Sequence, residues 1–205
     1  MCSSDLRIGY RVDELAELNT QLAQSDLRID SVCCRIDGEG QPIDAIDAFQ
    51  ELPALSHIGR VDWLLSLPYI DDEANAALAC RALFAAASLP NGYLFVDPPQ
   101  DLDRTMDAGH GLLDTRCNPR PAFHALRSLN TLLHVYRGEG YTRPEGVYSM
   151  RSSQGCIELL SANQEPSHRG EDMRWYNLVN GTVGKGYDRG DTNAERALQM
   201  YWSSP

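Results

Sequence analysis

The fold is decided by the stretch from Gly92 to His134, GYLFVDPPQDLDRTMDAGHGLLDTRCNPRPAFHALRSLNTLLH. It opens with Tyr93 to Val96, whose aromatic and β-branched residues are typical of a parallel strand covered on both faces. An aspartate-rich loop follows. The stretch ends in an amphipathic helix, which we expect to begin with Asn118 as N-cap and Pro119 at the first helical position. The apolar stripe of this helix consists of Ala122, Phe123, Leu126, Leu129 and Leu133.

The chain before this stretch alternates between helical and strand patterns. The expected elements are a helix at 11–24, a strand at 28–36, a helix at 42–52, a strand at 61–67 and an alanine-rich helix at 73–88. Asp72 is expected to cap the last of these helices. Such alternation predicts an α/β fold, in which parallel strands are joined by right-handed crossovers.

The segment HGLLDTRCNPRPAFHALRSLN, from His110 to Asn130, resembles the last strand–loop–helix unit of (β/α)8-barrel glycoside hydrolases, the retaining group with two glutamates. The resemblance implies a TIM barrel in which the three strands are the sixth, seventh and eighth. A complete barrel needs roughly 250 residues, so we expect a partial barrel made of the last three βα units.

Three segments of the chain are expected to differ in origin and fold. Residues Met1 to Leu6 resemble a translated sequencing-adaptor end, so we expect a gene fragment whose native beginning lies upstream. Residues 7–137 form the expected part of the barrel. After a glycine-rich linker, residues 146–205 show short strand patterns separated by Gly and Asn turns. They predict a β-rich, sandwich-like appendage, which the resemblance also implies.

Charge and cysteine content narrow the classes of partner and site. A net charge of −11 at pH 7 disfavours nucleic acid and anionic membrane surfaces as partners. The six cysteines include no C-x-x-C pair, so they are interpreted as buried apolar residues rather than as a metal site, and they favour a reducing compartment. No apolar run is long enough to span a membrane. We expect no metal and no cofactor, and the resemblance implies a carbohydrate substrate.

Each predicted strand is followed by an aspartate: Asp37, Asp71 and Asp97. The carboxyl ends of the strands form the active-site face of a (β/α)8 barrel. Acids at this face can bind sugar hydroxyls or act as general acid and base. Aspartate is also a common residue of turns and helix caps, so both interpretations stay open here.

The resemblance implies two catalytic glutamates, one after the fourth strand and one after the seventh. The predicted seventh strand ends in Leu65-Ser66-Leu67-Pro68, which contains no glutamate. Asp71 or Glu73 would have to take its place, with Asp37 as a further catalytic candidate. The parent is therefore either a glycoside hydrolase acting on a polysaccharide or oligosaccharide, of which this fragment is inactive alone, or a non-catalytic carbohydrate-binding barrel. An unrelated open α/β domain is the third possibility.

The loop after the third strand is the predicted substrate-binding segment, because its carboxylates can accept hydrogen bonds from sugar hydroxyls. Arg104 is its expected cation, paired with a neighbouring aspartate. Trp63, in a predicted strand, is expected in the core. The residues predicted to bind substrate are Asp97, Asp101, Asp103, Arg104, Asp107 and His110.

Overall fold

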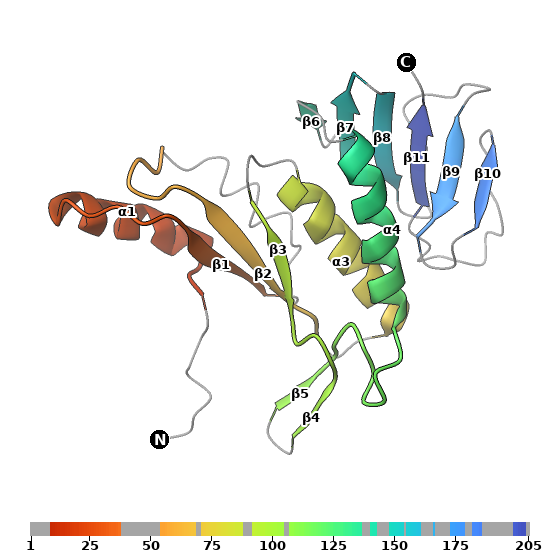
Figure 1. The fold of residues 1–205 in the computed structure, drawn as a ribbon, viewed down its shortest axis with the longest axis horizontal. Helices are drawn as coiled ribbons and strands as arrows, with labels where there is room; N and C mark the ends of the chain where they lie inside the picture. Colours follow the sequence, from red (N-terminus) through yellow and green to blue (C-terminus); the bar gives the residue numbers. More distant parts are fainter. Residues whose placement is uncertain are drawn as a thin grey trace.

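The computed structural model describes residues 9–37, 54–68, 71–87, 92–104, 107–136, 140–142, 148–153, 155–160, 166, 173–178, 182–185 and 199–203. The described part is a mixed α/β structure, with a parallel sheet and helices followed by an antiparallel sheet (Figure 1). The predicted helix at 42–52 and the segment Met1 to Leu6 lie outside the described residues.

Three parallel strands form the first sheet, in the order β1-β2-β3. Their bounds are Val32–Asp37 for β1, Val61–Ser66 for β2 and Leu94–Asp97 for β3. The helical segments are η2 (Val12–Glu14), α1 (Leu15–Gln24), α3 (Asp72–Ala87) and α4 (Pro121–Tyr136). Helix α3 packs against β2 and β3, and α4 packs against α3 (Figure 1). The prediction of a parallel sheet within an α/β fold is confirmed.

The alanines of α3 allow this helix to pack between the parallel sheet and α4. Ala76, Ala79, Ala82 and Ala86 are all buried, and such small side chains let a neighbouring helix approach closely. The facing stripe of α4 is also buried, through Ala122, Ala125, Leu129 and Leu133. Ala125 was not part of the predicted stripe, whereas Phe123 and Leu126 are only partly buried.

Both predicted helix starts are wrong, by two residues for α4 and by one residue for α3. Helix α4 begins at Pro121 rather than Pro119, because the Asn118 side chain binds Asp114 instead of capping the helix. Proline at the first helical position is favourable, since no helical partner exists for the missing N–H. Helix α3 is capped by Asp71, whose Oδ1 accepts a hydrogen bond of 2.8 Å from the Ala74 amide. Asp72 is the first residue of the helix.

The two faces of the parallel sheet differ in burial. One face packs into the core, and Trp63 at its centre is fully buried, which confirms its predicted place. The residues of this core face are Val32, Cys34, Ile36, Val61, Trp63, Leu65, Leu94 and Val96. The alternate residues form the opposite face, which we call the polar face. Its described side chains are Cys33, Arg35, Asp62, Leu64, Ser66, Tyr93, Phe95 and Asp97.

The expectation that β3 is covered on both faces is wrong for the described structure. Tyr93 is 58% exposed and Phe95 is 52% exposed on the polar face. Their rings contact one another at a centroid distance of 6.5 Å, and the Arg60 guanidinium lies 4.9 Å from the Tyr93 ring centre. An aromatic pair is therefore presented outward at the edge of the sheet.

Two segments that the sequence predicts as irregular contain strands. The loop after β3 holds a small hairpin of β4 (Leu102–Arg104) and β5 (Asp107–Gly109). The predicted linker contains β6 (Gly140–Thr142). Short polar segments with glycine carry weak strand signals, so strand pairing in three dimensions decides their conformation.

A six-stranded antiparallel sheet follows α4, in the order β10-β9-β11-β8-β7-β6. Its other strands are β7 (Tyr148–Ser152), β8 (Gly155–Leu160), β9 (Arg174–Asn177), β10 (Val183–Lys185) and β11 (Gln199–Ser203). It packs on the helices: the Ser128 hydroxyl lies 2.9 Å from the Tyr176 hydroxyl, and Phe84 meets Tyr148 edge to face. A sandwich also requires a second facing sheet, so that assignment stays a prediction.

The described cysteines occupy several environments. Cys34 and Cys80 are buried as predicted, and burial raises the pKa of the Cys34 thiol to about 12. Cys117 is exposed, in a turn with a positive φ of 63°, so it is not one of the buried cysteines. Within the described residues, no helix combines the length and hydropathy needed to cross a bilayer.

Candidate functional site

The carboxyl ends of the three parallel strands, called the carboxyl edge of the sheet below, carry a row of polar residues that we name the strand-end row. Asp37, Ser66 and Asp97 are the last residues of β1, β2 and β3, and they are paired in register. All three positions belong to the polar face, because they alternate with core-face residues. Asp97 is exposed. The sequence thus predicted two of the three strand-end acids correctly, whereas β2 ends at Ser66 rather than near Asp71.

Asp71 and Glu73, two of the catalytic candidates, lie at the start of α3. Asp71 caps the helix through the Ala74 amide, and Glu73 is exposed in its first turn. Acids at these positions interact favourably with the positive end of the helix dipole. This local role accounts for both residue types, and their catalytic role stays a prediction.

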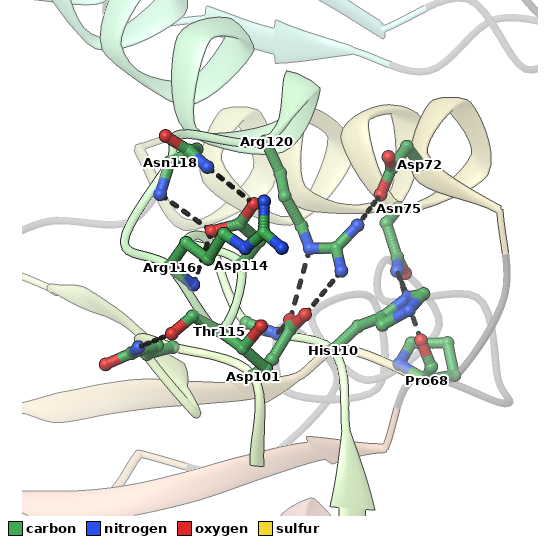
Figure 2. A network of polar contacts seen from close by, with 12 residues as sticks. Pro68, Asp72, Asn75, Asp101, His110, Asp114, Thr115, Arg116, Asn118 and Arg120 are labelled. Atoms are coloured by element: carbon green, nitrogen blue, oxygen red, sulfur yellow. Dashed lines mark hydrogen bonds and ion pairs between the residues drawn. The ribbon is translucent and has the colours of Figure 1, made fainter. Parts of the chain in front are cut away.

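An arginine joins the loop after β3 to both helices (Figure 2). Arg120, just before α4, donates from Nε to Asp101 Oδ1 at 3.1 Å and pairs through its terminal nitrogens with Asp101 and Asp72, the latter at 2.7 Å. The Arg120 side chain is 21% exposed and that of Asp101 is 13% exposed. A bidentate, largely buried pair of this kind is held in one geometry. The cation that pairs with Asp101 is therefore Arg120.

The Arg120–Asp101 pair shifts the pKa of both partners. The hydrogen bond from Arg120 is the main cause that lowers the pKa of the Asp101 carboxyl, and the Gly111 amide contributes in the same direction. The hydrogen bond to Asp101 in turn raises the pKa of Arg120. Both residues are therefore charged across the physiological range of pH.

Gly111 lets the loop close on itself beside this pair. Its amide donates to Asp101 Oδ1 at 2.9 Å. A Cβ at position 111 would lie 2.4 Å from the Gln100 carbonyl carbon, which is backbone and cannot move aside cheaply. The Asp101 amide also donates to the Leu113 carbonyl at 2.9 Å. The glycine is required by close packing of two backbone segments.

A compact turn leads from this loop into α4. Asp114 accepts hydrogen bonds of 2.8 Å from the amides of Arg116 and Asn118, and one of 2.9 Å from the Asn118 side chain. The bond from the Asn118 side chain is the main cause that lowers the pKa of Asp114. The turn fixes the place of Arg120 from the N-terminal side (Figure 2).

A second polar contact ties the loop to the carboxyl end of β2. Asn75 Nδ2 lies 3.1 Å from the Pro68 carbonyl oxygen and 3.2 Å from His110 Nδ1 (Figure 2). Of the predicted substrate-binding residues, Asp101 and His110 thus lie in one polar network around Arg120 and Asn75. Asp97 lies in the strand-end row.

The remaining predicted loop residues are Asp103, Arg104 and Asp107, which belong to the β4–β5 hairpin and are described by their backbone alone. Their binding role stays a prediction.

Sequence interpretation missed Arg120, although the segment Asn118-Pro119-Arg120-Pro121 was part of the recognised motif. An arginine between two prolines has a restricted backbone conformation, and this restriction was the feature of the sequence that could have identified Arg120. Within the described ranges, no group of three or more His, Cys, Asp or Glu residues is arranged to hold a metal ion.

Comparison with known proteins places the fold. No family model matches the chain, and no curated protein matches it. Among solved structures, a GH39 β-xylosidase from Caulobacter crescentus is similar with a TM-score of 0.53 and 13% identity, over 93% of this chain and 54% of that one. A family 39 glycoside hydrolase from Bacteroides cellulosilyticus WH2 has a TM-score of 0.46 and 14% identity, over 80% of this chain and 38% of that one.

The chain therefore has a glycoside hydrolase-like fold, as the resemblance implied. It spans about half the length of the β-xylosidase that it matches. Fold alone leaves the reaction open, because one fold supports many activities.

Proposed function

We propose that this chain is the C-terminal part of a (β/α)8 barrel from a protein that acts on a polysaccharide or oligosaccharide. The three parallel strands with their helices would be the last strands of that barrel, and the antiparallel sheet would be its β-rich appendage. The polar face would then line the interior of the barrel, where the exposed Tyr93 and Phe95 would be covered by the missing strands.

Tyr10 supports one more barrel strand in this chain, next to β1, in addition to the three strands of the sheet. It forms a parallel bridge with Cys34, donates its amide to the Cys33 carbonyl at 2.9 Å and accepts from the Arg35 amide at 2.7 Å. This pairing continues the sheet beyond β1 in the same parallel sense, with α1 as the connection. Four strand positions are half of the eight in a closed barrel, one more than the sequence suggested.

The strand-end row is the observation that carries the proposed carbohydrate function. The carboxyl edge of a barrel sheet is where active sites of this fold are built. Neighbouring strands lie about 4.8 Å apart, so the Asp37 and Asp97 backbones, two strands apart, are separated by roughly 10 Å. That width accommodates a sugar ring between two acceptors. We assign both acids to binding of sugar hydroxyls.

A second candidate function follows from Ser66. It occupies the end of β2, where a retaining hydrolase of the resembled group would need a carboxylate near the scissile bond. A hydroxyl there can bind a sugar but cannot serve as the catalytic carboxylate. A non-catalytic carbohydrate-binding barrel is consistent with this residue, and the hydrolase requires another acid, such as Asp71 or Glu73.

The proposal is tested by titrating the purified chain with xylo-oligosaccharides and malto-oligosaccharides while recording backbone amide NMR shifts. We expect no hydrolysis and weak binding of one series, with the largest shifts at Ser66 and Asp97. The variant Asp97→Asn keeps an acceptor oxygen but removes its charge, so it should weaken binding about fivefold, or roughly 1 kcal/mol, the difference between a hydrogen bond to a charged acceptor and one to a neutral acceptor.

Asp30→Asn is the matched control, because Asp30 is an exposed acid just before β1, at the amino ends of the strands and away from the carboxyl edge. It should leave binding unchanged. The proposal fails if neither sugar series shifts any amide at the carboxyl edge, or if Asp30→Asn weakens binding as much as Asp97→Asn does.

A further inference from the structure

Asn75 is an unusual residue for the interior of an alanine-rich helix. It is the fourth residue of α3 and is only 3% exposed. Its Nδ2 reaches both the Pro68 carbonyl oxygen and His110 Nδ1, whereas its buried Oδ1 has no hydrogen-bond partner. This buried amide costs stability, because its nitrogen makes two hydrogen bonds and its oxygen makes none.

The Pro68 carbonyl determines which end of the amide faces the histidine. A carbonyl oxygen only accepts, so the atom 3.1 Å away must be the amide nitrogen. Turning the amide over would set two oxygens against each other and bury an NH2 group without an acceptor. The observed orientation keeps two hydrogen bonds and leaves one acceptor unmatched, so it is the more stable of the two.

This orientation fixes the chemistry of His110. An amide nitrogen can only donate, so His110 Nδ1 must accept, and the ring proton must then lie on Nε2. We infer that Asn75 holds His110 as the neutral Nε2–H tautomer and anchors it at the carboxyl end of β2. Asn75 is a positioning residue: it acts through His110.

The consequence for ligand binding rests on the proposed carbohydrate function. His110 follows the β4–β5 hairpin and precedes Gly111, whose amide binds Asp101. The contact with Asn75 therefore ties the return of the hairpin to the edge that carries Ser66. With its proton on Nε2, that nitrogen can only donate a hydrogen bond, so any ligand atom that meets it must be an acceptor, such as a hydroxyl oxygen.

The tautomer is measured directly by the ring nitrogen NMR shifts of 15N-labelled protein near pH 8, with the His110 signals identified by their loss in His110→Gln. His57 is an internal control, because its Nδ1 lies 2.8 Å from the Leu27 carbonyl oxygen and must donate. We expect opposite patterns: the proton on Nδ1 in His57 and on Nε2 in His110. A proton on Nδ1 of His110 would overturn the inference.

Asn75→Asp provides the second measurement, since a carboxylate in place of the amide accepts and cannot donate. We expect the His110 proton to move to Nδ1, with His57 unchanged. An unchanged His110 pattern would show that Asn75 does not set the tautomer. In the sugar titration, the same variant should weaken binding about fivefold. If the wild-type chain binds no sugar, the proposed function fails, while the two NMR measurements still decide the tautomer.

Discussion

Replacing Arg120 with alanine is expected to lower the free energy of unfolding by about 3 kcal/mol, because it leaves a largely buried carboxylate without its partner. Asp101 would lose both hydrogen bonds from the guanidinium and Asp72 would lose one. Arg120→Lys should recover only part of the loss, since an ammonium group cannot bind Asp101 in the same bidentate way. Urea unfolding followed by circular dichroism measures both variants.

Arg11→Ala is the matched control, because the Arg11–Asp13 pair is 60% and 69% exposed. An exposed pair contributes roughly 0–1 kcal/mol. If Arg120→Ala costs no more than Arg11→Ala, the network around Arg120 does not hold the loop in place.

The pH dependence of the same variants gives a second readout. The folded state lowers the pKa of Asp101, so its contribution is complete above the ordinary value of about 3.9 and is lost as the pH falls through the lowered value. Wild-type stability should therefore decline with acid below about pH 4. This decline should be shallower in Arg120→Ala, where the hydrogen bond that chiefly lowers the Asp101 pKa is absent.

Gly111→Ala is expected to destabilise the chain by about 3 kcal/mol, at the upper end of the usual cost of overpacking. The added methyl would lie 2.4 Å from the Gln100 backbone, so the two loop segments would have to separate. This separation would also stretch the hydrogen bond from the Gly111 amide to Asp101. Urea unfolding measures the loss, and amide hydrogen exchange at Gly111 shows whether the bond is weakened.

Gly92→Ala provides a graded comparison, since its Cβ would lie 3.1 Å from the Val61 carbonyl oxygen and needs only a small adjustment. We expect a clearly smaller loss than for Gly111→Ala. Equal losses would mean that the loop relaxes freely around position 111, and that close packing against Gln100 does not define its shape.

The fold was largely predictable because its signals are local and repeated. Apolar strands such as Val61–Ser66 and amphipathic helices such as Leu15–Gln24 have strong periodic patterns. The ends of elements were less predictable. Asp114 and Asp71 compete with their neighbours for backbone amides, so the start of each helix depends on three-dimensional contacts.

The candidate site was predictable only in part, for a similar reason. Strand-end acids follow from the position of each strand, which is why Asp37 and Asp97 were found. Arg120 and Asn75 act through partners 19 and 35 residues away in sequence, Asp101 and His110. Periodicity carries no information about such pairs. The pairing of Tyr10 with β1 also depends on a contact that leaves no pattern in the sequence.

The proposal that this chain is the C-terminal half of a (β/α)8 barrel, here called the half-barrel proposal, is tested most directly by long-read sequencing of the source DNA upstream of the Met1 codon. We predict an open reading frame that continues upstream and encodes four more βα units and the beginning of the strand that includes Tyr10. A glutamate after the fourth strand would favour the hydrolase, and its absence the carbohydrate-binding barrel. An in-frame stop codon directly before Met1 would contradict the half-barrel proposal.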